Sequence, residues 1–248
     1  VVAPDGNKHA DYAPQAYLDY VAEHVESYSY LKYPFLKKVG WKGFVDGVES
    51  CVYKATPLSR LNVSDGMPTP AAQAEYERFY ETLTGDKSGK KPVHATLATH
   101  WARVVELVYA CEATRDMAKD DEITSDKIHN IPTGIVGEGV GIVEAPRGTL
   151  THHYKTDQKG IITEANLIVG TTNNNAAITM SIKRAAEGLI KKGVQITDGV
   201  LNRIEMAFRA YDPCFGCATH SLPGEMPLEV VVHDAESGDI IQTARHNC

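Results

Sequence analysis

The sequence predicts a mixed α+β fold, in which long helices form a bundle and short strands form small antiparallel sheets. Three observations lead to this class. Apolar residues recur at helical spacing over long stretches, short β-like runs follow one another in the second half, and turn signals join neighbouring runs as hairpins require. The 248 residues, 43% of them hydrophobic, are enough to bury a substantial core.

The first half of the chain is expected to be mostly helical. Helices are predicted at residues 14–26, about 70–83 and 95–119, separated by irregular stretches at 28–60, 84–92 and 120–139. The stretch 28–60 is rich in aromatic residues and glycine without a clean period, so we expect a loop with short strands there. One apolar face of the third helix is expected to be buried, and its residues are Leu97, Trp101, Val104, Val105, Val108 and Cys111.

In the second half the period of the apolar residues changes. Strands are predicted at residues 140–144, 150–155, 161–169, 228–232 and 239–243, and helices at about 176–192 and 197–210. The turn-forming segment 156–160 predicts a hairpin between the strands on either side of it. Gly193 is expected to end the first of these helices, and Thr197 or Asp198 to cap the second.

Charge and cysteine content exclude several classes of function. The formal net charge is −7 and the pI is about 5.8, which argues against a nucleic-acid partner or an anionic membrane surface. No apolar run reaches the roughly 18 residues of a membrane span, and the first residues do not resemble a secretory signal. Five cysteines, an odd number, favour a reducing compartment, so we expect a cytoplasmic protein.

The strongest chemical signal is the pair Cys214 and Cys217, followed by His220. Two thiolates at this spacing can bind one soft or borderline metal, and Gly216 lets the backbone curl so that both sulfurs face the same way. On spacing alone three interpretations stay open. The pair could be half of a structural zinc site, a redox dithiol, or part of a catalytic metal site whose other ligands lie elsewhere.

The residues around this pair resemble the C-terminal nickel-binding motif of [NiFe]-hydrogenase large subunits. The motif is DPCFGCATH at residues 212–220, after a predicted helix that contains IEMAFR. The segment EAPRGTLTH at 144–152 resembles the family's EAPRG segment, and VGTTNN at 169–174 stands where the family lines its iron site. The resemblance covers most of the chain, which is similar to the C-terminal half of a large subunit of the cytosolic methyl-viologen-reducing or bidirectional type.

The resemblance implies a role for each metal-binding residue. Cys214 would be a terminal nickel thiolate, and Cys217 would bridge nickel and an Fe(CN)2CO unit. Thr171 would donate a hydrogen bond to a cyanide nitrogen. His220 would bind magnesium or a similar ion near the C-terminus.

The resemblance also implies the reaction, which is the reversible heterolytic cleavage of H2. Arg147 would place its guanidinium over the open nickel–iron position, where it would polarise H2 or accept its proton. Asp212 would pair with Arg147 and orient it. Electrons would leave through iron–sulfur clusters in a small partner subunit.

Each assignment has a plainer structural alternative. Arg147 could be a surface ion-pair partner, Asp212 could form only an Asx turn, and residues 171–175 could be an N-cap cluster. Packing or surface roles are expected for His94, His100, His152 and His153. Cys51 and Cys111 are expected to be buried as small apolar residues, and Cys248 to be a free thiol.

The chain departs from the family pattern in two ways. It has no R-x-C-G-x-C motif, which supplies the other two cysteines of the centre, so we expect it to be inactive alone and to need the N-terminal half from the same or another chain. Residues 1–220 are expected to form the C-terminal part of the large-subunit domain, and 221–248 an extension that a maturation protease removes. Two further alternatives are a non-catalytic relative of the respiratory complex I type and a zinc-stabilised interaction module.

Overall fold

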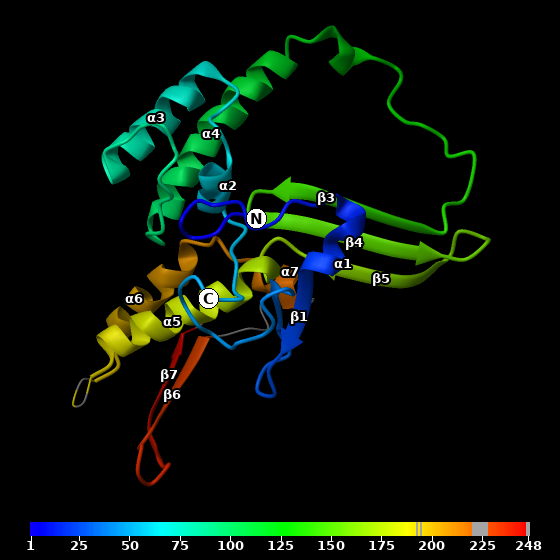
Figure 1. Cartoon of the computed structure of the whole chain (residues 1–248). Helices are drawn as coiled ribbons and strands as arrows, with labels where there is room; N and C mark the ends of the chain where they lie inside the picture. Colours follow the sequence, from blue (N-terminus) through cyan, green and yellow to red (C-terminus); the bar gives the residue numbers. More distant parts are fainter. Residues whose placement is uncertain (192, 194, 220–227, 247–248) are drawn as a thin grey trace.

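The computed structural model describes residues 1–191, 193, 195–219 and 228–246, and it confirms the mixed α+β class (Figure 1). Within these ranges the strands form two hairpins and one three-stranded sheet, all antiparallel. The helices pack in two groups, α2 with α3 and α4, and α5 with α6. Over the same residues, no helix is both long enough and apolar enough to cross a membrane.

The N-terminal region differs from the single helix expected at residues 14–26. A 3-10 turn, η1 (Pro14–Ala16), and a short helix, α1 (Tyr17–Tyr20), lead directly into strand β1 (Val21–Val25). This strand pairs with β2 (Lys32–Leu36) in an antiparallel hairpin. The prediction was wrong for β1 because backbone pairing with a later strand, rather than local periodicity, determines its conformation.

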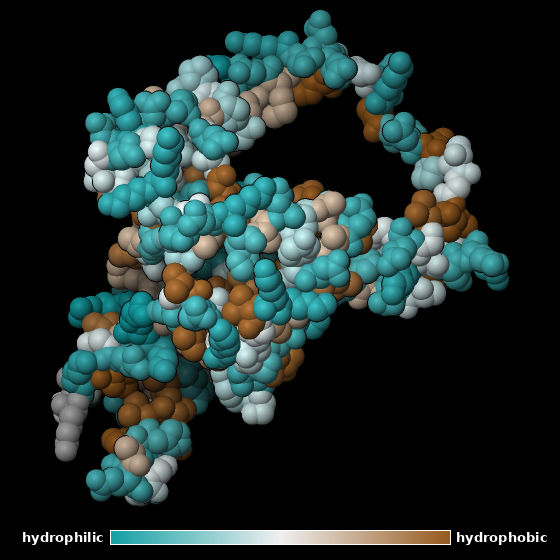
Figure 2. Space-filling view, in the orientation of Figure 1, coloured by the Kyte–Doolittle hydropathy of each residue, from teal (hydrophilic) through white to brown (hydrophobic). Residues whose placement is uncertain are grey.

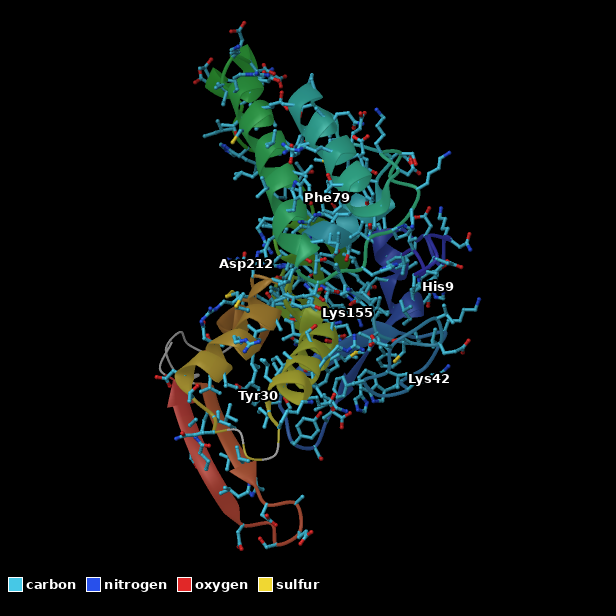
Figure 3. The ribbon with its side chains drawn as sticks, turned by 90° about the vertical axis from the view of Figure 1, so that its left-hand side faces the viewer. His9, Tyr30, Lys42, Phe79, Lys155 and Asp212 are labelled. Atoms are coloured by element: carbon cyan, nitrogen blue, oxygen red, sulfur yellow. A yellow bond between two sulfur atoms is a disulfide. The ribbon has the colours of Figure 1, made fainter. Side chains whose placement is uncertain are left out.

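Three helices build the largest core cluster. These are α2 (Pro57–Val63), α3 (Pro70–Thr84) and α4 (Ala98–Met117), and the last two confirm the predicted helices. The buried residues of this cluster are Leu58, Leu61, Tyr76, Phe79, Tyr80, Val93, Ala102 and Val105, with Phe79 lying between α3 and α4 (Figure 3). Helix α2 was not predicted from the sequence, although Thr56 caps it by accepting the Ser59 N–H at 3.2 Å.

The predicted apolar face of α4 is only partly buried. Ala102 and Val105 face α2 and α3, whereas Leu97, Val104 and Cys111 are exposed. The prediction that Cys111 is buried was therefore wrong, while Cys51 is fully buried as expected. Helices α2 and α3 cover one side of α4, and Arg103 of α4 also bonds the Ala210 carbonyl at the end of α6. The periodicity of α4 could not indicate which side would be buried.

The three-stranded sheet supports one part of the candidate site. Its strands are β3 (Glu138–Ala145), β4 (Gly148–Thr156) and β5 (Ile162–Ile168), paired in that order. They confirm the predicted strands and the hairpin at 156–160. Because Ala145 pairs directly with Gly148, Arg147 lies in a two-residue turn between β3 and β4.

Before this sheet, the segment that follows α4 is the long connection that the sequence predicts. It contains one 3-10 turn, η2 (Asp121–Thr124), and stands out from the molecule as an arch (Figure 2). Several of its side chains are apolar and exposed, among them Ile128 and Ile131.

The last helices and strands follow the prediction, except that α7 was not predicted. Helices α5 (Asn175–Leu189) and α6 (Asp198–Arg209) pack together, and the short helix α7 (Phe215–Thr219) follows them. Strands β6 (Leu228–His233) and β7 (Ile240–His246) form the expected C-terminal hairpin.

The sequence also predicted which residues lie at two ends of these helices. Thr197 is the N-cap of α6, as expected. Gly193 does not end α5 as predicted, because this helix already ends at Leu189 and Ile190 is its C-cap.

Candidate functional site

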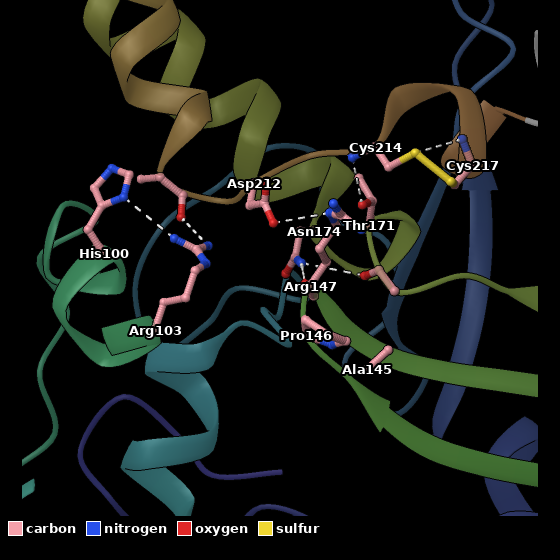
Figure 4. A network of polar contacts seen from close by, with 12 residues as sticks. His100, Arg103, Ala145, Pro146, Arg147, Thr171, Asn174, Asp212, Cys214 and Cys217 are labelled. Carbon is pink, nitrogen blue, oxygen red and sulfur yellow. Dashed lines mark hydrogen bonds and ion pairs between the residues drawn. A yellow bond between two sulfur atoms is a disulfide. The ribbon is translucent and has the colours of Figure 1, made fainter. Parts of the chain in front are cut away.

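Three segments that are far apart in the sequence meet at one place (Figure 4). The turn after β3 supplies Arg147, and the segment before the 3-10 turn η3 (Thr172–Asn174) supplies Thr171. The segment after α6 supplies Asp212 and leads to the cysteines. Contacts between these segments link the predicted site residues that the structure describes. His220 lies outside the described residues.

Arg147 and Asp212 form an ion pair, with 3.1 Å between Nε and Oδ2. The two side chains are 46% and 48% exposed, and an ion pair this open to water contributes only about 0–1 kcal/mol to stability. Arg147 forms a surface ion pair, as the plainer alternative held, but its partner Asp212 belongs to the cysteine motif at residues 212–220. A planar guanidinium held at one edge keeps further N–H donors for a ligand.

The backbone of Asp212 is left-handed, with φ 49°, and no other non-glycine residue in the described ranges has a positive φ. Asp tolerates this region better than most residues, and the following Pro213 disfavours the right-handed helical alternative. Two residues before Asp212, the Ala210 carbonyl accepts a hydrogen bond from Arg103 Nη2 at 3.0 Å. The chain therefore turns sharply just after α6, and the Asp212 carboxylate contacts Arg147.

Asn174 holds the backbone of Arg147. Its Nδ2 donates to the Arg147 carbonyl at 2.9 Å, and its Oδ1 accepts the Ala55 N–H at the same distance. The side chain is 1% exposed, so these bonds are shielded from water. Asn174 occupies the N-cap position of α5, as the alternative interpretation held, but its side chain makes no cap bond and binds the Arg147 turn instead.

The neighbouring asparagines also bond to other segments. Asn173 donates to the Thr149 carbonyl at 2.6 Å, and Asn175 donates to the Lys32 carbonyl at 2.9 Å. The sequence signal for this role was the run of three amides, Asn173 to Asn175, next to the start of a predicted helix. The role of these asparagines could not be predicted, because their partners are backbone carbonyls, which every residue type provides.

Gly148 allows three backbone segments to approach one another. A methyl group on Gly148 would lie 2.3 Å from the Gly170 carbonyl oxygen and 2.6 Å from that of Ala55. Gly170 immediately precedes Thr171, so this contact joins the Arg147 turn to the Thr171 segment. A side chain at residue 148 would push the two apart.

The two cysteines lie side by side around α7. Their Cα atoms are 5.3 Å apart, and the two sulfurs are bonded to each other in a disulfide. The Cys214 N–H donates to Thr171 Oγ1 at 3.1 Å, and the Cys217 N–H donates to Cys214 Sγ at 3.4 Å. Thr171 is 2% exposed, whereas Cys217 is exposed, so the sulfur pair stands at the edge of a buried support.

The donor set fits half of a nickel–iron centre. Two adjacent sulfurs suit a soft or borderline metal once the disulfide is reduced to thiolates. In the part of the chain that the structure describes, no group of three or more His, Cys, Asp and Glu side chains could hold a metal ion. Further ligands would have to come from other residues.

The remaining histidines have the packing or surface roles expected of them. His153 is buried and bonds to Tyr17 at 3.0 Å and to Glu138 at 2.8 Å. The other contacts join His152 to Tyr154, His94 to the Pro4 carbonyl, and His100 to Arg103.

Known proteins match this chain along most of its length. A family model described as nickel-dependent hydrogenase matches residues 4–220. The chain is 48% identical over 241 residues to an iron-sulfur subunit of the F420-non-reducing hydrogenase of Archaeoglobus profundus, and the match covers 97% of this chain and 48% of that protein. It is 41% identical over 245 residues to the beta subunit of the NAD-reducing hydrogenase HoxS of Cupriavidus necator, covering 97% of this chain and 48% of that one. The chain thus spans about half the length of these curated relatives.

Solved structures agree with these matches. The NAD+-reducing [NiFe]-hydrogenase in its H2-reduced state superposes with a TM-score of 0.73 at 36% identity, over 84% of this chain and 43% of that one. A [NiFeSe] hydrogenase variant from Desulfovibrio vulgaris Hildenborough superposes with a TM-score of 0.50 at 22% identity, over 79% of this chain and 39% of its own. The second match supports the fold alone.

Proposed function

We propose that this chain, which belongs to the nickel-dependent hydrogenase family, forms half of a [NiFe]-hydrogenase catalytic subunit that converts H2 reversibly into protons and electrons. The observation that carries the proposal is the meeting of Arg147, Asp212 and the cysteine pair, since these residues come from separate motifs. Because the chain spans about half the length of its relatives, the activity is proposed for the assembled subunit.

The cysteines would hold the metals, with Cys214 as a terminal nickel thiolate and Cys217 as the bridge between nickel and an Fe(CN)2CO unit. When bound, this centre supplies the heterolytic cleavage of H2. Thr171 would bond a cyanide nitrogen, because a hydroxyl that accepts one hydrogen bond can still donate another. His220 would bind magnesium or a similar ion, a role that rests on the motif alone.

Arg147 would act on the substrate side of the site. Its Nε faces the Asp212 carboxylate, so its Nη groups would bring the positive charge of the guanidinium to the open metal position and polarise H2 there. To accept the proton of H2, the guanidinium would first have to lose one of its own protons. The negative charge of Asp212 would keep the guanidinium in one orientation. Both side chains are half exposed, which gives a ligand access to them.

Two protein partners belong to the proposal. The missing half-subunit, in the same chain or another, would supply the R-x-C-G-x-C cysteines. A small subunit would carry the iron–sulfur clusters that take up electrons. The apolar side chains left exposed on α4 and on the arch support a covering partner, since Leu107 is 59% and Ile128 83% exposed.

Two further points concern maturation and location. Residues 221–248 would be removed by a maturation protease after nickel insertion, and intact-mass measurement before and after protease treatment tests this. A cytoplasmic location is proposed because five cysteines, an odd number, favour a reducing compartment.

Metal analysis of the assembled subunit tests the function. Nickel together with iron is expected. Zinc alone would instead identify a zinc-stabilised interaction module, and a folded complex without metal would identify a non-catalytic relative or an apo precursor.

Arg147→Lys tests the mechanism in the same complex. Turnover of H2 should fall by at least about tenfold with nickel and iron retained, because lysine lacks the planar fork. Arg78→Lys, at an exposed position on α3, is the matched control and should leave turnover unchanged. Unchanged turnover in Arg147→Lys would remove this residue from the mechanism.

A further inference from the structure

One guanidinium, that of Arg60 on α2, bonds both to the turn that carries Arg147 and to helix α4. Its Nη1 donates to the Ala145 carbonyl at 2.9 Å, and its Nη2 donates to the Pro146 carbonyl at 3.0 Å. Its Nε and Nη2 also donate to the two carboxylate oxygens of Glu106, each at 2.6 Å. The Arg60 and Glu106 side chains are only 15% and 23% exposed.

Together with Asn174, this arrangement fixes three consecutive carbonyls of the turn. Arg60 binds those of Ala145 and Pro146, and Asn174 binds that of Arg147. Each peptide unit is planar, so a fixed carbonyl fixes the orientation of its whole peptide plane. The direction in which the Arg147 side chain leaves the backbone is set by these planes.

We infer that Arg60, oriented by Glu106, is a positioning residue for Arg147. The inference deepens the proposed function and rests on it for the catalytic role of Arg147. The Nε and Nη2 of Arg60 donate to Glu106, while Nη1 and Nη2 donate to carbonyls of the turn. A single ammonium group could not form all four of these hydrogen bonds in the same directions.

A simple tie between two helices would not need this geometry. Helices α2 and α4 already pack through Leu58, Leu61 and Val105, and a lysine could pair with Glu106 across them. The two bonds to the Ala145 and Pro146 carbonyls reach beyond both helices. These bonds are what distinguish a positioning role from a structural one.

Amide hydrogen exchange in the complete hydrogenase complex tests the positioning directly and does not depend on activity. In Arg60→Lys the peptide covering residues 142–150 should exchange faster, while peptides from α3 keep their wild-type rate. Glu106→Gln, which keeps the size of the side chain but removes its charge, should show the same local change to a smaller degree. Arg78→Lys should leave the exchange of the turn unchanged, because Arg78 is 73% exposed and its partner Glu75 lies on the same helix, α3. Unchanged exchange of the turn in both Arg60→Lys and Glu106→Gln, or faster exchange throughout, would overturn the inference.

Turnover then shows whether Arg60 acts through Arg147. Arg60→Lys should lower H2 turnover at least about tenfold with nickel and iron retained. The double variant Arg60→Lys with Arg147→Lys should be no slower than Arg147→Lys alone. Once the Arg147 guanidinium is gone, the loss of Arg60 can no longer displace it. Losses that multiply would mean that Arg60 acts independently of Arg147 and would contradict the inference.

The two proposals can fail separately. If Arg147→Lys keeps full turnover, the catalytic role of Arg147 fails, while hydrogen exchange still decides whether Arg60 holds the turn. If Arg147→Lys is inactive and Arg60→Lys leaves both exchange and turnover unchanged, the proposed function stands and only the inference about Arg60 fails.

Discussion

Gly148→Ala should damage both the stability and the activity of the subunit. The added methyl would meet the Gly170 carbonyl oxygen at 2.3 Å and the Ala55 carbonyl oxygen at 2.6 Å, whereas real contacts of this kind stay above 3.0 Å. Relief of the first contact therefore needs a backbone shift of about 0.7 Å, from 2.3 to 3.0 Å. Both obstacles are backbone atoms inside the fold, so neither can rotate away as a flexible side chain would.

The size of the effect follows from this clash. Inserting a methyl group into a packed interior costs about 1–3 kcal/mol, and we expect the upper part of that range because two carbonyls are involved. Residue 148 adjoins Arg147, and a misplacement on the order of 1 Å at a reacting group can lower turnover about 100-fold. Urea unfolding and H2 turnover of the complete subunit measure the two effects.

Gly141→Ala is the matched control for this substitution. Gly141 lies on β3 of the same hairpin, and a methyl group there would meet no heavy atom within 4 Å. Its free energy of unfolding should change by no more than about 0.5 kcal/mol, with turnover intact. Equal behaviour of the two alanine variants would refute the close-approach argument for Gly148.

Three other changes test separate parts of the structure. Asp212→Asn should keep stability but lose turnover, whereas Asp212→Ala should also lose about 1–2 kcal/mol, because alanine tolerates a positive φ poorly; urea unfolding compares the two. The Gln242 side-chain amide bonds both the N–H (3.2 Å) and the carbonyl (2.7 Å) of Ile196. Gln242→Ala should therefore loosen the attachment of the C-terminal hairpin to Ile196, and amide hydrogen exchange of the hairpin should become faster. Burial raises the pKa of Tyr80 and Tyr211, so just above about pH 10 these phenols ionise in the unfolded chain and stay neutral in the folded one. The midpoint of urea unfolding should therefore fall as the pH rises beyond that value, and it should fall less in Tyr80→Phe.

Much of the fold was predictable because the signal is local. Helices α3 to α6 and strands β3 to β5 follow the apolar period of their own residues. The segment Val21–Val25 was predicted as part of a helix, and its pairing with Lys32–Leu36, which lies outside any local pattern, makes it a strand instead. The buried side of α4 could not be predicted either, since the burial of Val105 and the exposure of Val104 depend on the neighbours of the helix.

The candidate site divides in the same way. Motif residues such as Arg147, Asp212 and Cys214 could be named from the sequence because their side chains carry the chemistry. Arg60 and Asn174 could not, since they bond to backbone carbonyls 85 to 86 and 27 residues away, respectively, and any residue type provides a carbonyl. Only the folded chain brings these donors and acceptors together.

The Arg147–Asp212 pair cannot maintain its own geometry, because an ion pair so exposed contributes about 0–1 kcal/mol. Its geometry must come from the buried contacts behind it, at Asn174, Gly148 and Thr171. Removing the charge of the pair should therefore change turnover and leave stability nearly constant, while changes to the buried contacts should alter both. If Asp212→Asn lost as much stability as Gly148→Ala, the Arg147–Asp212 pair itself would hold the segments together. The buried contacts would then depend on the ion pair, which is the opposite of what we expect.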